Sequence, residues 1–170
     1  MKKALSNFHM QFTNSKAALL CLLACCLIFV DLLTKAWIYT SLPSWQEVSV
    51  FKDFGGIDFS LRFVKNHGAA WGLFSSYQEW LVALRLILIV SLVVFTFFLN
   101  RQRKWDLPLV LLISGAIGNV IDCYRYGFVV DFLQFTFWGY PFAVFNVADA
   151  AVTLGVAWLF FVGEEREQTA

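Results

Sequence analysis

Four apolar segments, each close to the length of a bilayer crossing, constrain this chain more than any other feature. They cover residues 17–38, 80–99, 107–123 and 142–162. A spanning helix needs roughly 20 mostly apolar residues, because the hydrocarbon core offers no partner to an unpaired backbone group. Of the 170 residues, 59% are apolar and 15% charged, whereas about 25% are charged in a typical soluble domain. The sequence therefore predicts an all-α membrane protein, a single domain with four transmembrane helices.

The positive charges beside these segments predict their orientation. Cytoplasmic loops carry an excess of lysine and arginine. Such residues precede the first segment and separate the second from the third: Lys2, Lys3, Lys16, Arg101, Arg103 and Lys104. We therefore expect both termini on the cytoplasmic side. The long first connection, with a β and loop region at about 45–75, and the connection 124–141 would then face outward.

The first outer connection contains a strand pattern. Residues 57–63 alternate between apolar and polar types, and this period of two is typical of a half-buried strand. Gly55 and Gly56 precede them and favour a turn, and residues 47–51 could form the partner strand of a hairpin. We expect a small extracytoplasmic β-sheet between the first two helices, with its apolar face toward the membrane surface.

Several ionisable or amide side chains interrupt the apolar segments, and such groups are functional candidates because they are costly inside a bilayer. Asp31 and Lys35 are four residues apart and share a helix face. They indicate either a structural ion pair or part of a binding site. Asn119 and Asp122 share a face of the third segment. Both could join neighbouring helices through buried hydrogen bonds, and Asp122 could also be catalytic.

Two further aspartates lie near the outer ends of the segments. Asp131 lies in a strongly apolar outer stretch, and Asn146 with Asp149 forms an Asn-x-x-Asp pattern typical of a helix start. In the predicted topology Asp122, Asp131 and Asp149 meet at the outer membrane boundary. Two carboxylates in one low-dielectric site cannot both ionise readily, so one can act as an acid and the other as a base on a water molecule. This chemistry hydrolyses peptides without a metal ion or a covalent nucleophile.

Other functions fit the sequence less well. The chain has no HExxH zinc motif and no GxSxG serine motif. Its four cysteines show no CxxC spacing, and a net charge of +1 gives no basic field for nucleic acid. A small proton-coupled transporter would place its key acid at mid-span. A scaffold without enzymatic activity would use the polar residues only to join helices. Both alternatives stay open from the residues alone.

Five short blocks follow one another along the chain. They are DLLTK at 31–35, NHGAAWG at 66–72, GAIGNVID at 115–122, VVDF at 129–132 and FNVAD at 145–149. In this order they resemble the bacterial lipoprotein signal peptidases, also called signal peptidase II. The resemblance implies an aspartic endopeptidase of the bacterial inner membrane, without a cofactor. It would remove signal peptides from prolipoproteins by cutting before a cysteine that carries diacylglycerol.

The resemblance also implies roles for individual residues. Asp131 and Asp149 would form the catalytic pair. Other positions match residues that support or line the family's site: Asp31, Lys35, Asn66, Gly68, Asn119, Asp122 and Asn146. The family has an arginine where this chain has Cys123, and we expect Arg125 to supply that charge if the third helix ends near Asp122. The partners would be lipid-modified signal peptides and membrane lipid, and we expect a monomer.

Overall fold

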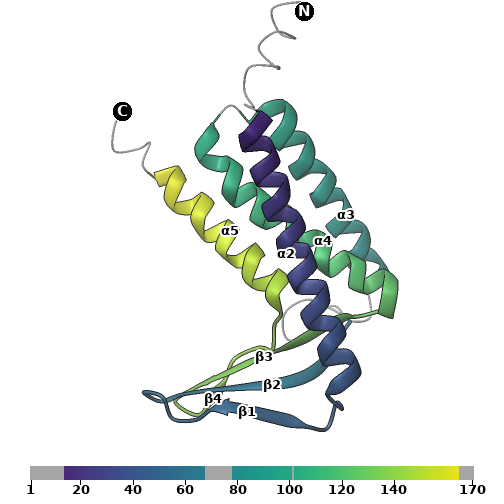
Figure 1. Ribbon diagram of the computed structural model, residues 1–170, viewed down its shortest axis with the longest axis vertical. Helices are drawn as coiled ribbons and strands as arrows, with labels where there is room; N and C mark the ends of the chain where they lie inside the picture. The colour runs from purple at the N-terminus through teal and green to yellow at the C-terminus, as the bar shows by residue number, and fades with distance from the viewer. Residues whose placement is uncertain (1–13, 68–77, 101, 165–170) are drawn as a thin grey trace, which may run out of the picture.

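The fold combines a bundle of helices with a sheet across one end of it (Figure 1). The computed structural model describes residues 14–67, 78–100 and 102–164. Its helices are α2 (Asn14–Ser41), α3 (Gln78–Val94), the π-helical turn η3 (Phe95–Leu99), the short 3-10 turn η4 (Arg103–Trp105), α4 (Asp106–Tyr126) and α5 (Val147–Glu164). Its strands are β1 (Glu47–Phe51), β2 (Ile57–Asn66), β3 (Val129–Phe137) and β4 (Tyr140–Pro141).

Three helical stretches of the described chain are long and apolar enough to cross a membrane: Ala17–Ser41, Glu79–Leu99 and Arg103–Tyr126. They correspond to the first three predicted segments. The apolar part of the last helix, Val147–Val162, is shorter. A crossing by α5 therefore stays a prediction.

The fourth segment was predicted to begin at residue 142, but the helix begins only at Val147. The reason is that Phe145 forms an isolated antiparallel bridge to Leu133 of β3. Its backbone N–H donates to the carbonyl oxygen of Leu133 at 3.1 Å, and the N–H of Leu133 donates back at 2.8 Å. The sheet thus holds the chain extended up to the residue before the cap of α5.

The sheet is larger than the predicted hairpin. It is antiparallel, with the order β1-β2-β3-β4, so the connection between α4 and α5 supplies half of its strands. The predicted strand at 47–51 is confirmed, and the one at 57–63 extends to Asn66. β3 was missed because its first four residues, 129–132, are all buried. A strand buried in this way shows no alternation of apolar and polar residues.

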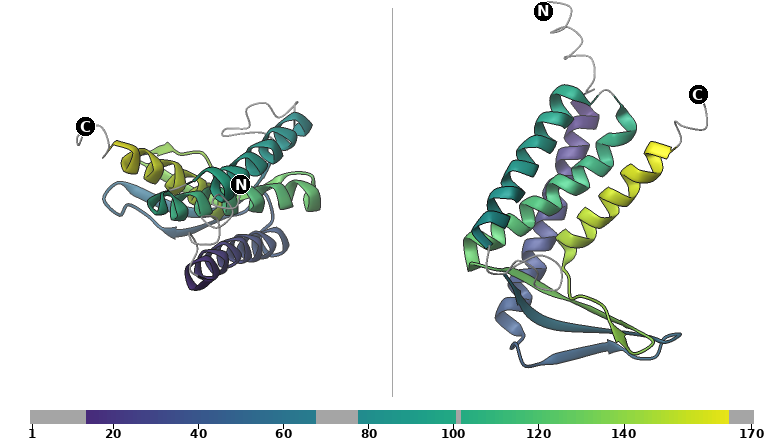
Figure 2. Two further views of the ribbon diagram at one scale, coloured as in Figure 1. Left: turned by 90° about the horizontal axis from the view of Figure 1, so that it is seen from above. Right: turned by 180° about the vertical axis from the view of Figure 1, so that it is seen from behind.

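The sheet is joined to the bundle by a hydrophobic core at the end of α2. Ile38 of α2 packs there with buried side chains of the sheet and of the turn before it: Phe63, Phe128, Val130 and Phe132. Two views show the strands running across the end of the bundle beneath α2 and α5 (Figures 1 and 2). This junction fixes β3 against the start of α5.

Within the bundle, α4 lies close to α2 and α5 because small residues face them. A Cβ atom added at Gly118 would lie 2.5 Å from Oδ2 of Asp31, and one at Gly115 would collide with the carbonyl oxygen of Ala148. Small residues allow helix backbones to approach closely in membranes. This close approach brings polar groups of α2, α4 and α5 into hydrogen-bonding range.

Candidate active site

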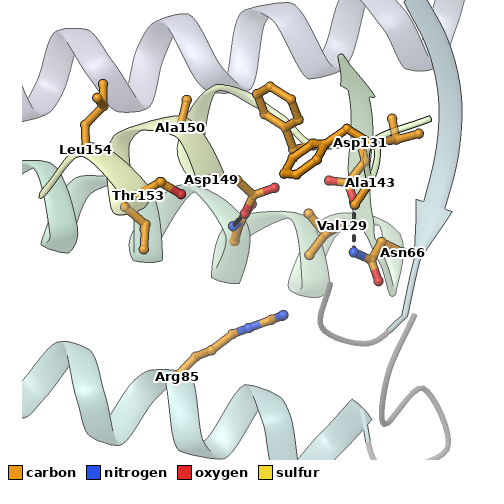
Figure 3. A pocket seen from close by; sticks show the side chains of 14 residues that line it. Asn66, Arg85, Val129, Asp131, Ala143, Asp149, Ala150, Thr153 and Leu154 are labelled. Carbon is orange, nitrogen blue, oxygen red and sulfur yellow. Dashed lines mark hydrogen bonds between the residues drawn. The ribbon is translucent and has the colours of Figure 1, made fainter. Parts of the chain in front are cut away.

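Asp131 and Asp149 line one cavity of about 570 Å³ at the junction of bundle and sheet. β3 carries Asp131 and the first turn of α5 carries Asp149. Asn66 of β2 lines the same cavity (Figure 3). Asn119 of α4 also lines it. The structure therefore brings together four of the predicted site residues from four different elements.

Asp131 is held by two asparagine side chains. The Nδ2 group of Asn146 donates to its Oδ1 at 2.7 Å, and Nδ2 of Asn66 donates to its Oδ2 at 2.8 Å. The residue is only 2% exposed. Burial raises the pKa of the Asp131 carboxyl to about 7, and repulsion from Asp149 adds to the increase, while the asparagine hydrogen bonds partly oppose it. Asp131 can therefore keep a proton up to nearly neutral pH.

Asp149 belongs to the cap of α5. Its backbone N–H donates to Oδ1 of Asn146 at 2.8 Å, and the N–H of Asn146 donates to Oδ2 of Asp149 at 3.2 Å. This reciprocal pair is the capping arrangement predicted from Asn-x-x-Asp, and it is confirmed. Nδ2 of Asn119 donates to the other carboxylate oxygen at 2.8 Å. Asn146 contacts both aspartates of the pair and so links their positions.

Lys35 lies at the centre of the polar contacts behind the cavity and is fully buried. Its Nζ atom lies 2.7 Å from Oδ2 of Asp31 and 3.1 Å from Oδ2 of Asp122. It also donates to Oδ1 of Asn119 at 2.9 Å. Asn119 in turn donates to Asp149. Asn119 therefore links the ammonium group of Lys35 to the Asp149 carboxylate of the cavity. The pair Asp31 and Lys35 is thus a buried ion pair.

The two aspartates beside Lys35 each hold the backbone next to a cavity aspartate. Oδ1 of Asp31 accepts a hydrogen bond from the N–H of Ala148 at 2.9 Å, one residue before Asp149. Oδ2 of Asp122 accepts one from the N–H of Val130 at 3.0 Å, one residue before Asp131. The geometry gives Asp31 and Asp122 supporting positions.

The structure contradicts the condition on which Arg125 was expected to act. α4 continues past Asp122 to Tyr126 and ends at Gly127, whose φ of 76° is left-handed. Arg125 is exposed, and its guanidinium lies 5.2 Å from the centre of the Tyr126 ring. It does not line the cavity. Gly68, with the rest of its block from residue 69 to 72, lies outside the described residues.

Sequence reasoning missed a charged residue of the cavity wall, Arg85 of α3. A signal for it was present, because Arg85 is the one charged residue in the apolar segment 80–99. A charge inside such a segment is a functional candidate by the same argument that singled out Asp31.

Comparisons with known proteins show which family the chain is similar to. The model of a family described as signal peptidase (SPase) II matches residues 23–163. A lipoprotein signal peptidase of Clostridium tetani is 38% identical over 143 residues, covering 81% of this chain and 88% of the relative. One of Chlamydia pneumoniae is 40% identical over 134 residues, covering 78% of this chain and 73% of the relative.

Two solved structures are similar to the whole fold. Both are described as a bacterial membrane enzyme solved by the in meso method. The one at 2.3 Å resolution has a TM-score of 0.79 and 28% identity, and the match covers 94% of this chain and 93% of that one. The one at 1.9 Å resolution has a TM-score of 0.75 and 29% identity, and the match covers 89% of this chain and 94% of that one.

Proposed function

The chain belongs to the signal peptidase II family, and from this membership we propose that it is a membrane-embedded aspartic endopeptidase of prolipoproteins. It removes the signal peptide by cutting before the cysteine that carries diacylglycerol. One observation carries the proposal: Asp131 and Asp149 line a single cavity, and Asn146 bonds to both. The apolar helices and the family make it a multi-pass protein of the inner membrane.

The proposed reaction uses the two carboxylates as an acid and a base on water. We assign the shared proton at rest to Asp131, because burial raises the pKa of its carboxyl to about 7. Asp149 removes a proton from the water as the water oxygen bonds to the carbonyl carbon before the lipidated cysteine. Asp131 gives its proton to the leaving nitrogen as the C–N bond breaks. The products are a signal peptide with a new carboxyl end and a lipoprotein with a new amino end.

The position of the cavity supports a substrate that stays in the membrane. Apolar side chains of α5, among them Ala150, Val152 and Leu154, line the cavity beside the aspartates. Leu154 of α5, one of these lining residues, is 61% exposed, so the cavity lies beside an apolar surface. A signal peptide helix could lie against it while the acyl chains remain in the bilayer.

We propose four spans with α5 as the last, both termini cytoplasmic and the site toward the outer face. α2 begins and α5 ends at the end of the bundle opposite the sheet (Figure 1), which supports termini on one side. Exposed aromatic side chains occur in and beside the sheet: Trp45, Phe54, Trp138 and Tyr140. Such residues are enriched at membrane–water interfaces. We also propose that the chain acts as a monomer.

The test is a comparison of two peptides with the purified protein in detergent. Both carry a lipobox, and only one carries diacylglycerol on its cysteine. We expect cleavage of the lipidated peptide alone, before the cysteine. No cleavage of either peptide would contradict the function and would favour a transporter or a scaffold. Equal cleavage of both would contradict the lipid requirement.

The pKa of Asp131 predicts the pH profile of this reaction. The shared proton is held below pH about 7 and lost above it. With both carboxylates charged, no acid remains for the leaving nitrogen, so kcat/KM should fall about tenfold per pH unit on the alkaline side. The measurement is kcat/KM across this range, with the melting temperature of the protein followed at each pH. A flat profile above neutral pH, with the protein folded, would argue against Asp131 as the acid.

A further inference from the structure

Arg85 is a positively charged residue of the cavity wall. The proposed reaction, which uses Asp131 and Asp149, does not assign it a role. It comes from the middle of the apolar helix α3 and is half-buried. Its side chain extends from α3 toward the elements that carry Asp131 and Asp149 (Figure 3). Among the described residues that line the cavity it is the one with a positive charge. A charged residue inside a spanning helix is costly, and such residues face cavities and mark functional sites.

The guanidinium of Arg85 is positioned by a cysteine of the neighbouring helix. Its Nη1 atom donates to Sγ of Cys123 on α4 at 3.5 Å. A thiol is a weak hydrogen-bond acceptor, whereas a guanidinium carries five N–H donors in a rigid fork and no acceptor. The contact with Cys123 therefore locates the guanidinium between α3 and α4 at the cavity wall.

We propose that Arg85 is a substrate-binding residue, whose guanidinium donates hydrogen bonds to main-chain carbonyl oxygens of the signal peptide beside the cut. This inference rests on the proposed function. A peptide that enters the cavity presents carbonyl oxygens, which are acceptors only. The asparagine amides at the cavity already donate to carboxylates, Asn66 to Asp131 and Asn119 to Asp149. Arg85 adds a strong donor from the wall opposite α5, in surroundings of low dielectric where such bonds are stronger.

The contact at Cys123 makes a second, sharper prediction. Because Sγ of Cys123 lies 3.5 Å from Nη1 of Arg85, a longer side chain at position 123 would reach the space that the guanidinium occupies. An arginine at position 85 and an arginine at position 123 would thus place a guanidinium group in the same part of the cavity. An arginine at 123 should replace the one at 85.

Binding measurements test this without depending on cleavage. The full chain carrying Asp131→Asn serves as a form that binds without turnover, and the probe is the lipidated lipobox peptide in detergent. Adding Arg85→Met should weaken binding by roughly tenfold to a hundredfold, the size expected for a hydrogen bond to a charged group. Adding Cys123→Arg to that variant should restore most of the affinity. Melting temperatures show whether each variant is folded.

Arg125→Met is the matched control, since it removes an exposed arginine of α4 that does not line the cavity. We expect its affinity to stay within about twofold of the parent. The inference would be overturned by unchanged affinity in folded Arg85→Met, by an equal loss in Arg125→Met, or by no recovery with Cys123→Arg. A loss that occurs only when anionic lipid is added to the micelles would assign Arg85 to a phosphate headgroup and would also overturn it. If the wild-type chain binds the peptide through Arg85 but does not cut it, the proposed function fails and the binding role stands.

Discussion

Asp131→Asn should abolish cleavage of the lipidated peptide, and Asp149→Asn should do the same. An asparagine amide has nearly the shape of the carboxyl group but neither accepts nor delivers the proton that the reaction moves. General acid and base catalysis contribute about 10²- to 10⁴-fold each, so we expect kcat/KM to fall by about 10³-fold or more in either variant. The measurement is peptide cleavage by purified protein at matched folded concentration.

The matched control for both variants is Asp58→Asn. Asp58 lies on β2, outside the cavity, and its Oδ1 atom accepts a hydrogen bond from the N–H of Asp53 at 2.7 Å. The same chemical change there should leave kcat/KM nearly unaltered and should report any general effect of losing a negative charge. Substantial turnover by folded Asp131→Asn or Asp149→Asn would rule out the proposed pair.

The sequence predicted the helices because their cause is local. A run of about 20 apolar residues in a bilayer has few alternatives to a helix, and the stretches ending at Ser41 and Leu99 followed from this. The start of α5 did not, because Phe145 is apolar and would suit a helix as well as a strand. Its place was decided by hydrogen bonds to Leu133, and a partner distant in sequence leaves no periodic signal. The same holds for β3, whose buried residues 129–132 gain their partners from β2.

The site shows a similar division. Topology alone indicated that Asp122, Asp131 and Asp149 converge, and the family resemblance then distinguished a catalytic pair from supports. The hydrogen bond from the N–H of Val130 to Asp122 could not be predicted from the sequence, because it depends on how the chain turns after α4 at Gly127. Arg85 was missed although its charge in an apolar segment was a signal, because only the fold shows that α3 brings it to the cavity wall. Arg125 was overrated because nothing local indicated that α4 continues to Tyr126.

Lys35→Met should be the most damaging substitution outside the cavity. Methionine has nearly the length of lysine, so the change removes the charge and leaves the packing. Oδ2 of Asp31 and Oδ2 of Asp122, both buried, would then lose the cation that lies 2.7 Å and 3.1 Å from them. Breaking a buried ion pair by removing one partner costs about 3–5 kcal/mol. We expect a clear fall in the melting temperature in detergent and little cleavage at the temperature where the wild type is active.

The matched control is Lys104→Met, because Lys104 lies near the opposite end of α4 and its Nζ donates to the carbonyl oxygen of Val162 at 3.0 Å in an exposed position. A hydrogen bond of this kind contributes about 1 kcal/mol, so its loss should change the melting temperature little.

Cleavage by Lys35→Met at a low temperature, where the variant is still folded, separates an effect on stability from an effect on the position of the carboxylates. Through Asp31 and Asp122, Lys35 fixes the N–H groups of Ala148 and Val130. If these contacts position the catalytic carboxylates, kcat should fall in the folded variant while KM changes little. A folded Lys35→Met protein with the kcat of the wild type would mean that Lys35 contributes to stability alone.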